Sequence, residues 1–81
     1  MIVYYYTFRS MTAAMTAAGK LKKSGYTAMP VRTPEGLRKK GCGYCIAIPE
    51  NGFAKIRAVL SHRDYEKLYA HASGEWKEVI R

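Results

Sequence analysis

Two cysteines, Cys42 and Cys45, carry the most reactive side chains in this chain of 81 residues, and they lie three positions apart. A basic run of Arg38, Lys39 and Lys40 comes shortly before the first of them. Nearby positive charge favours the thiolate over the thiol, and the thiolate is the form that attacks electrophilic sulfur or selenium. The sequence therefore indicates Cys42 as a candidate nucleophile beside a basic, anion-binding run.

Glycines stand on both sides of this cysteine, at Gly41 and Gly43. They leave the thiol of Cys42 little steric cover, and their backbone amides can hydrogen-bond a bound anion or a developing negative charge. The alternative is that Cys42 is a small buried residue at the start of a strand, because cysteines are often buried and inert. The residues alone leave both interpretations open.

The Cys-x-x-Cys spacing also suggests a redox pair, but the pair leads into a predicted strand and not into a helix N-terminus. Residues three apart in a regular strand point to opposite faces and lie about 10 Å apart, too far for a disulfide unless Cys42 is still in the loop. We keep Cys45 as a candidate second thiol. A metal site that adds His62 and His71 is a weaker alternative, since these histidines are nine positions apart. We expect no metal and no cofactor.

The chain is strongly basic. It has 14 Lys and Arg against 6 Asp and Glu, which gives a formal charge of +8. Such a charge attracts nucleic acid, acidic protein surfaces, phosphate or anionic membranes, and a charge count does not choose among them. The carboxylates show no paired spacing for acid-base catalysis, and no glycine fingerprint for phosphate binding precedes a helix. Conventional hydrolysis and nucleotide binding are therefore not indicated.

The length suits one domain over residues 1–81, with residues 72–81 as a C-terminal extension that forms either a short helix or an edge strand. The opening apolar run, residues 2–8, is too short for a signal peptide and much shorter than the about 20 residues that span a bilayer. We therefore expect a cytoplasmic protein with no membrane association.

One helix is well marked in the sequence. Ser10 is a suitable N-cap, and Gly25 suits the left-handed residue that follows a last turn. Apolar residues follow at helical spacing and predict one buried face; they are Met11, Ala14, Met15, Ala18 and Leu21. The pattern predicts a helix over residues 11–24.

The remaining segments predict an α+β fold. Strands are expected over residues 2–8, 26–32, 43–48 and 65–71, a second helix over 52–61, and a loop over 33–41. Two βαβ-like units in so short a chain predict the ferredoxin-like βαββαβ arrangement, an antiparallel sheet with two helices on one face.

Nucleic-acid binding is the main rival to thiol chemistry. Tyr4 and Tyr6 share one face of the first strand, and together with Tyr44 they could form a sheet platform for stacked bases. The alternative is that these tyrosines pack against the helices or cover a dimer interface. A third interpretation makes the domain a non-catalytic, homodimeric interaction or regulatory module.

Four features resemble the Putative Se/S carrier protein-like family of small bacterial proteins. They are the strand ending Thr7-Phe8-x-Ser10, the amphipathic helix, the Thr33-Pro34 step, and Cys42-Gly43 opening a strand. The resemblance extends from about residue 2 to about residue 71. It implies that Cys42 holds sulfur or selenium as a persulfide or selenopersulfide and passes it to an acceptor protein. This would make the chain a carrier, served by donor and acceptor proteins, more than a turnover enzyme.

Overall fold

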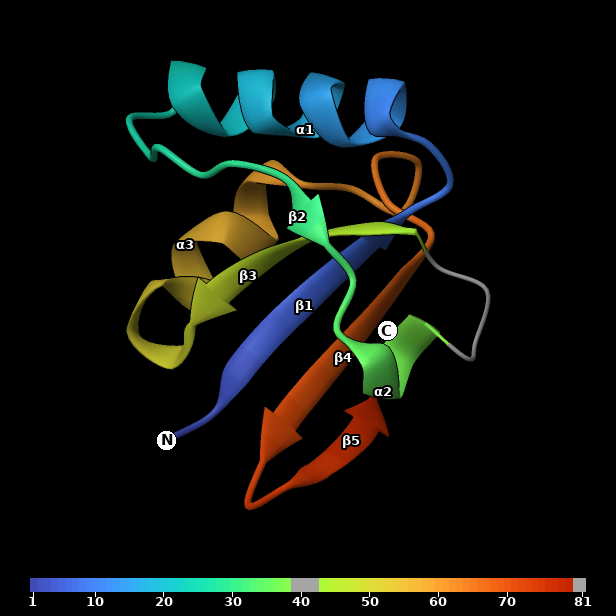
Figure 1. Ribbon diagram of the computed structural model, residues 1–81. Helices are drawn as coiled ribbons and strands as arrows, with labels where there is room; N and C mark the ends of the chain where they lie inside the picture. The colour runs from blue at the N-terminus through green and yellow to red at the C-terminus, as the bar shows by residue number, and fades with distance from the viewer. Residues whose placement is uncertain (39–42, 80–81) are drawn as a thin grey trace.

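The computed structural model describes residues 1–38 and 43–79, which form an α+β fold (Figure 1). Its strands are β1 (Val3–Phe8), β2 (Val31–Arg32), β3 (Tyr44–Pro49), β4 (Lys67–Ala72) and β5 (Glu75–Glu78), and its helices are α1 (Met11–Lys23), α2 (Glu35–Arg38) and α3 (Glu50–Val59). The sheet has the order β2-β3-β1-β4-β5, and every neighbouring pair is antiparallel. The predicted α+β class is confirmed, with a further strand and a further helix in the described residues.

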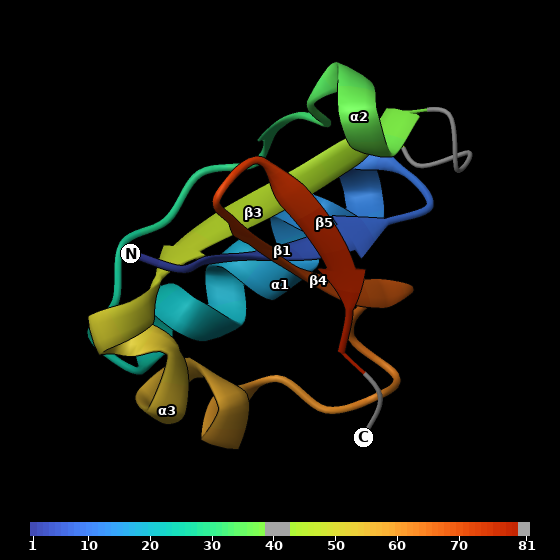
Figure 2. The ribbon, with the colours of Figure 1, turned by 90° about the horizontal axis from the view of Figure 1, so that it is seen from below.

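Two helices cover one face of the sheet. Both α1 and α3 contact β1 and β3, and they also contact each other. Figure 2 shows α1 behind β1, β3 and β4, with β5, the edge strand of the same sheet, toward the viewer. The core under the two longer helices consists of Tyr6, Phe8, Ala14, Ala17, Ala18, Leu21, Ile46, Ile48, Ile56, Leu60 and Leu68.

Capping interactions define both ends of α1 as predicted. The Ser10 hydroxyl accepts a hydrogen bond from the Ala13 amide at 3.2 Å. At the other end, Gly25 has a φ of 88°, and the Tyr26 amide donates to the Leu21 carbonyl at 2.9 Å. This is a Schellman motif, in which a left-handed residue turns the chain back on the last turn.

The buried face of α1 differs from the predicted one. Ala14, Ala17, Ala18 and Leu21 are buried, whereas Met11 and Met15 are 44% and 49% exposed. The small alanines let the helix approach the sheet closely, and this rotates the two methionines out of the contact. The inclusion of both methionines in the core face was therefore wrong.

The opposite face of the sheet is covered in part by α2, in the segment that was predicted to be a loop. Leu37 is fully buried there, and its amide donates to the Pro34 carbonyl at 2.9 Å. Cys45 and Tyr69 are also buried, but neither belongs to the core under α1 and α3. The prediction of an irregular 33–41 segment was wrong for residues 35–38.

Two further segments differ from the sequence prediction. The predicted strand over residues 26–32 pairs with β3 only at Val31 and Arg32, and Pro30 has no N–H to extend the pairing. The C-terminal extension forms β5, so the open choice between helix and edge strand is resolved for Glu75–Glu78. Ser73 and Gly74 connect β4 to β5 with φ values of 52° and 77°, as in a type I′ turn.

Candidate functional site

The predicted nucleophile and most of its basic run fall outside the described residues. These positions are Lys39, Lys40, Gly41 and Cys42. Arg38, the remaining residue of the run, is the last residue of α2. The structure therefore describes only the residues on either side of this segment.

The base of the segment is fixed to the sheet. The Thr33 amide donates to the Gly43 carbonyl at 3.2 Å, and Thr33 is fully buried. Pro34, the next residue, is half-buried and starts the turn that leads into α2. Gly43 is exposed, and apart from Gly43 itself and its chain neighbours no atom of the described residues lies within 4 Å of the position that a Cβ would take. The residue that follows Cys42 is thus anchored through its backbone and open on its outer side.

Cys45 lies in a different environment from Gly43. It is a β3 residue opposite Thr7 of β1 and Val31 of β2, and its exposed fraction is 0%. A thiol that solvent does not reach is shielded from reagents and partner proteins. For Cys45 to act as the predicted second thiol, the structure that covers this face of β3 would therefore have to open.

A hollow of about 520 Å³ lies at the same end of the sheet as Gly43, since Phe8 pairs with Tyr44. It is lined by Phe8, Arg9, Ala13, His62, Arg63, Asp64, Tyr65 and Glu66. Arg9, His62 and Arg63 are exposed, and Arg9 makes an ion pair of 3.4 Å with Glu66. Sequence reasoning did not bring Arg9 and Arg63 together, because they come from two segments far apart in the chain and match no motif.

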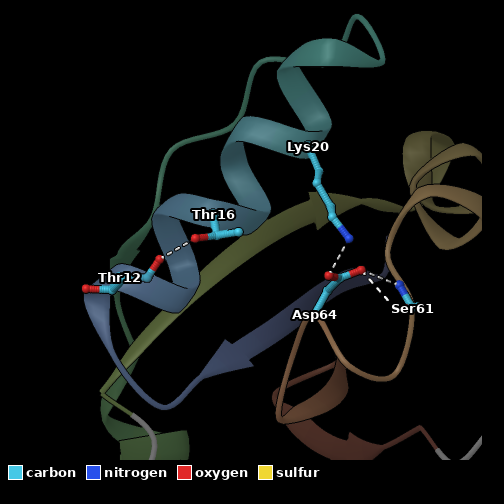
Figure 3. Close-up of polar contacts among 5 residues, drawn as sticks. All are labelled: Thr12, Thr16, Lys20, Ser61 and Asp64. Carbon is cyan, nitrogen blue, oxygen red and sulfur yellow. Dashed lines mark hydrogen bonds and ion pairs between the residues drawn. The ribbon is translucent and has the colours of Figure 1, made fainter.

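Asp64 is one of the residues that line this hollow, and Figure 3 shows its contacts with Lys20 and Ser61. Its carboxylate accepts hydrogen bonds from Lys20 Nζ at 2.6 Å and from the Ser61 amide at 2.8 Å. Burial alone would raise the pKa of Asp64, but the hydrogen bonds from Lys20 and Ser61 outweigh it and lower the pKa below the ordinary value. The Asp64 carboxylate is therefore favoured in its charged form in the folded protein, and both of its oxygens already accept hydrogen bonds.

The two histidines do not share a site. His62 lines the hollow beside Phe8, whereas His71 pairs with Val3 at the opposite end of β1. The His71 ring instead lies against Trp76, with ring centroids 4.1 Å apart. Within residues 1–38 and 43–79, no group of three or more His, Cys, Asp and Glu residues could hold a metal ion.

The proposed tyrosine platform faces the helices. Tyr4 stacks on Phe53 of α3 at 3.7 Å between ring centroids, and Tyr6 is fully buried. Tyr44 also packs partly against the same core. The platform for stacked bases was therefore wrong, and the alternative, packing against the helices, is what the structure has.

One comparison with known proteins gives a match. The family model described as Putative Se/S carrier protein-like matches residues 3–70, which is more than half of the chain. The matched range contains both cysteines and ends within β4, before β5. No curated protein and no solved structure shows a significant match. Among the described residues, the longest helix is α1 with 13 residues, and none has the length and apolar content to cross a bilayer.

Proposed function

The chain belongs to the Se/S carrier protein-like family, and from this membership we propose that Cys42 carries sulfur or selenium and passes it to an acceptor protein. The observation that carries the proposal is the family match over residues 3–70, because Cys42 lies within it. The exposed Gly43 and the basic run before Cys42 support this choice of thiol over the buried Cys45. A carrier of this kind needs a reducing compartment such as the cytoplasm, where thiols stay reduced.

The transfer is a thiol exchange without net oxidation. The Cys42 thiolate attacks the terminal sulfur of a donor protein persulfide, a new S–S bond forms at Cys42, and the donor cysteine leaves as a thiolate. In the second step an acceptor thiolate attacks the terminal sulfur, and Cys42 leaves as a thiolate. A selenopersulfide follows the same two steps with selenium as the transferred atom. Arg38, Lys39 and Lys40 would stabilise the anionic sulfur in each state.

Positive charge at this end of the molecule fits acidic donor and acceptor surfaces. Arg9 and Arg63 line the hollow beside Phe8 together with Asp64 and Glu66, so the excess of positive charge comes from the basic run that the sequence places close to Cys42. Complementary charge raises the rate at which such partners meet and orients their approach. The hollow beside Phe8 would receive part of the partner that brings its cysteine to Cys42.

We further propose that β1, α1, β2, β3, α3 and β4 form a ferredoxin-like core, with α2 and β5 as additions. The order β2-β3-β1-β4 and the position of α1 and α3 on one face support this assignment. An experimental structure in which β2 does not pair with β3 would contradict it.

Sulfur loading tests the proposed carrier function directly. The protein is treated with glutathione persulfide, the excess is removed, and intact mass is measured before and after reduction. We expect wild type and Cys45→Ala to gain one sulfur atom that reductant removes, and Cys42→Ala to gain none. Cys42→Ala should unfold at the same urea concentration as wild type if its role is chemical. Equal loading of Cys42→Ala and wild type would contradict the assignment.

The pH dependence of alkylation tests the activation of the thiol. In a Cys45→Ala background, the rate of iodoacetamide reaction at Cys42 should have a midpoint well below the about 8.5 of an ordinary cysteine. The basic run is the cause, so replacing Arg38, Lys39 and Lys40 with glutamine should raise the midpoint. A midpoint at the ordinary value, or a thiol protected from the reagent, would mean that Cys42 is structural.

A further inference from the structure

The sheet face opposite α1 and α3 is covered over only part of its length. On this face the cross-strand row that holds Thr7 and Cys45 is buried, and Leu37 of α2 is buried as well. The two rows nearer the start of β1 leave several side chains exposed or partly exposed, and we call these six residues the open half-face: Val3, Tyr5, Ala47, Pro49, His71 and Trp76. Figure 2 views the sheet from this side, with α1 behind it.

Three rings of the open half-face pack against one another. Trp76 lies edge-on to Tyr5, with ring centroids 4.9 Å apart, and against His71 at 4.1 Å. On another side a Cβ built on Gly36 of α2 would collide with Nε1 of the indole, so glycine lets α2 lie close to the ring. Rings that are already held in place lose little freedom when a partner covers them. They are also the side chains that are enriched in protein interfaces.

The positive charge of the described chain lies mostly away from this surface. None of the six residues is Lys or Arg, whereas α1 and α3, on the other face, carry Lys20, Lys22, Lys23, Lys55 and Arg57. Among the strand residues, Arg32 and Lys77 alternate onto the face under the helices. Lys67 is on the open side but belongs to the buried row of Thr7, and Glu78 adds a negative charge beside Tyr69. The molecule therefore has a cationic helix side and a sheet side that is poor in cations.

This distribution favours a second copy of the chain as the partner of the open half-face. Nucleic acid or an acidic protein would gain most at the helix side, where the cations are. Two copies that each carry +8 repel one another unless their cationic sides stay apart. Contact through the open half-faces keeps them apart, because two packed sheets lie about 10 Å apart and the helices lie beyond them. That separation exceeds the Debye length of about 8 Å at physiological salt.

We propose that the chain forms a weak, two-fold symmetric dimer through the open half-face, with the rings of Tyr5, His71 and Trp76 at its centre. A two-fold axis across the strands would place the α2 helices of the two copies at opposite ends, so that neither blocks the contact. Six residues a side is well below the about 20–30 of a standard interface, so the dimer is transient, with a dissociation constant on the order of 100 μM. The dimer goes beyond the carrier function and does not depend on it.

Sedimentation equilibrium of the full chain in reductant tests the dimer, from about 10 μM to about 1 mM so that the expected constant is bracketed. The mean mass of wild type should rise from monomer toward dimer. Ala47→Glu places a carboxylate in the exposed centre of the surface and should weaken association at least about tenfold, because like charges then meet across the interface. Thr16→Glu adds the same charge on the exposed side of α1 and should leave the constant within about twofold.

Two further measurements locate the contact. Trp76 is the single tryptophan of the chain, so its emission reports this surface directly, and dilution of wild type should shift the emission to longer wavelength. Ala47→Glu should keep the dilute emission at every concentration. An equimolar mixture of Ala47→Glu and Ala47→Lys should associate more tightly than either variant alone, because opposite charges meet only in the mixed dimer.

The outcomes decide between this dimer and its rivals. Wild type that stays monomeric over the whole range, or association that Ala47→Glu and Thr16→Glu weaken equally, would overturn the proposal. Single-stranded RNA whose binding is lost in Ala47→Glu but kept in Thr16→Glu would assign the surface to nucleic acid instead. If Ala47→Glu does not fold, the concentration dependence of wild-type Trp76 emission decides. Sulfur loading of Cys42 should be equal in wild type and Ala47→Glu, and its failure in both would overturn the carrier function alone.

Discussion

Lys20 Nζ lies 2.6 Å from Asp64 Oδ1, so the last turn of α1 is joined to the segment between α3 and β4 (Figure 3). The Asp64 side chain is largely buried, and its second oxygen accepts hydrogen bonds from the amide and hydroxyl of Ser61. The pair therefore connects the helix layer to the wall of the hollow beside Phe8.

The Asp64→Asn variant should be less stable than wild type at neutral pH and nearly equal to it in acid. In the folded protein the pKa of Asp64 is lowered from its ordinary value of 3.8, so the charged form stabilises the fold. This contribution is full above the ordinary pKa and is lost as pH falls through the lowered pKa. We expect the unfolding free energy of Asp64→Asn to be about 1 kcal/mol lower than that of wild type at pH 7. This difference should decrease below about pH 4.

Urea unfolding of both proteins at several pH values measures this difference. Arg9→Gln is the matched control, because Arg9 belongs to an exposed ion pair with Glu66 that should contribute little. A difference between wild type and Asp64→Asn that stays constant from neutral pH to acid would refute the role of the charge.

The Ser10→Ala variant should lose about 1 kcal/mol of unfolding free energy, because the Ala13 amide loses its hydrogen-bond acceptor. Thr12→Ala is the control, since Thr12 is exposed in the first turn and should change stability by less than about 0.5 kcal/mol. Thermal unfolding followed by circular dichroism compares the two variants. An equal loss in both would show that the Ser10 hydroxyl does not cap α1.

Cys45 should be alkylated far more slowly than Cys42 in the native protein. Its exposed fraction is 0%, so reaction requires a local or global opening of the sheet layer. Fragment-ion mass spectrometry distinguishes the two cysteines, and added urea should bring the Cys45 rate up along the unfolding transition. A Cys45 rate in the native protein that equals its rate in the unfolded protein would contradict the position of Cys45 in the structure.

Two glycine substitutions should have opposite effects on stability. Gly74→Ala should cost about 1 kcal/mol, because Gly74 has a φ of 77° in the turn between β4 and β5. Gly19→Ala should gain about 1 kcal/mol, because Gly19 lies within α1 and no atom blocks an added methyl group. Urea midpoints of the two variants test both signs. A loss of stability in Gly19→Ala would mean that α1 is more tightly packed at this position.

The segments with strong local signals could be predicted from the sequence. Ser10 and Gly25 mark the ends of α1 through chemistry that depends on adjacent residues alone, and the β-branched and aromatic run marks β1. These signals do not report which side of an element meets the core. Tyr4 and Tyr6 were correctly placed on one face of β1, but only the packing of Phe53 decides that this face is the covered one.

The short helix α2 could have been expected from Thr33, Pro34 and Glu35, since Thr is a good N-cap and Pro and Glu suit a first turn. The two glycines and the charges that surround Leu37 obscured this signal. The contact of Gly36 with Trp76 lay beyond prediction, because a glycine that admits a distant ring looks the same in sequence as one in a turn. For the candidate site, the choice of Cys42 stays a prediction, while the hollow beside Phe8 required the structure.

The two edges of the sheet limit how copies of this chain can associate. The outer edge at β2 is only two residues long, and the edge at β5 carries Glu75, Lys77 and Glu78 as exposed charges. Short and charged edges resist the backbone pairing that builds continuous sheets between molecules. Concentrated samples should therefore form no fibrous aggregates. A stable self-association would have to use side-chain surfaces in place of strand edges.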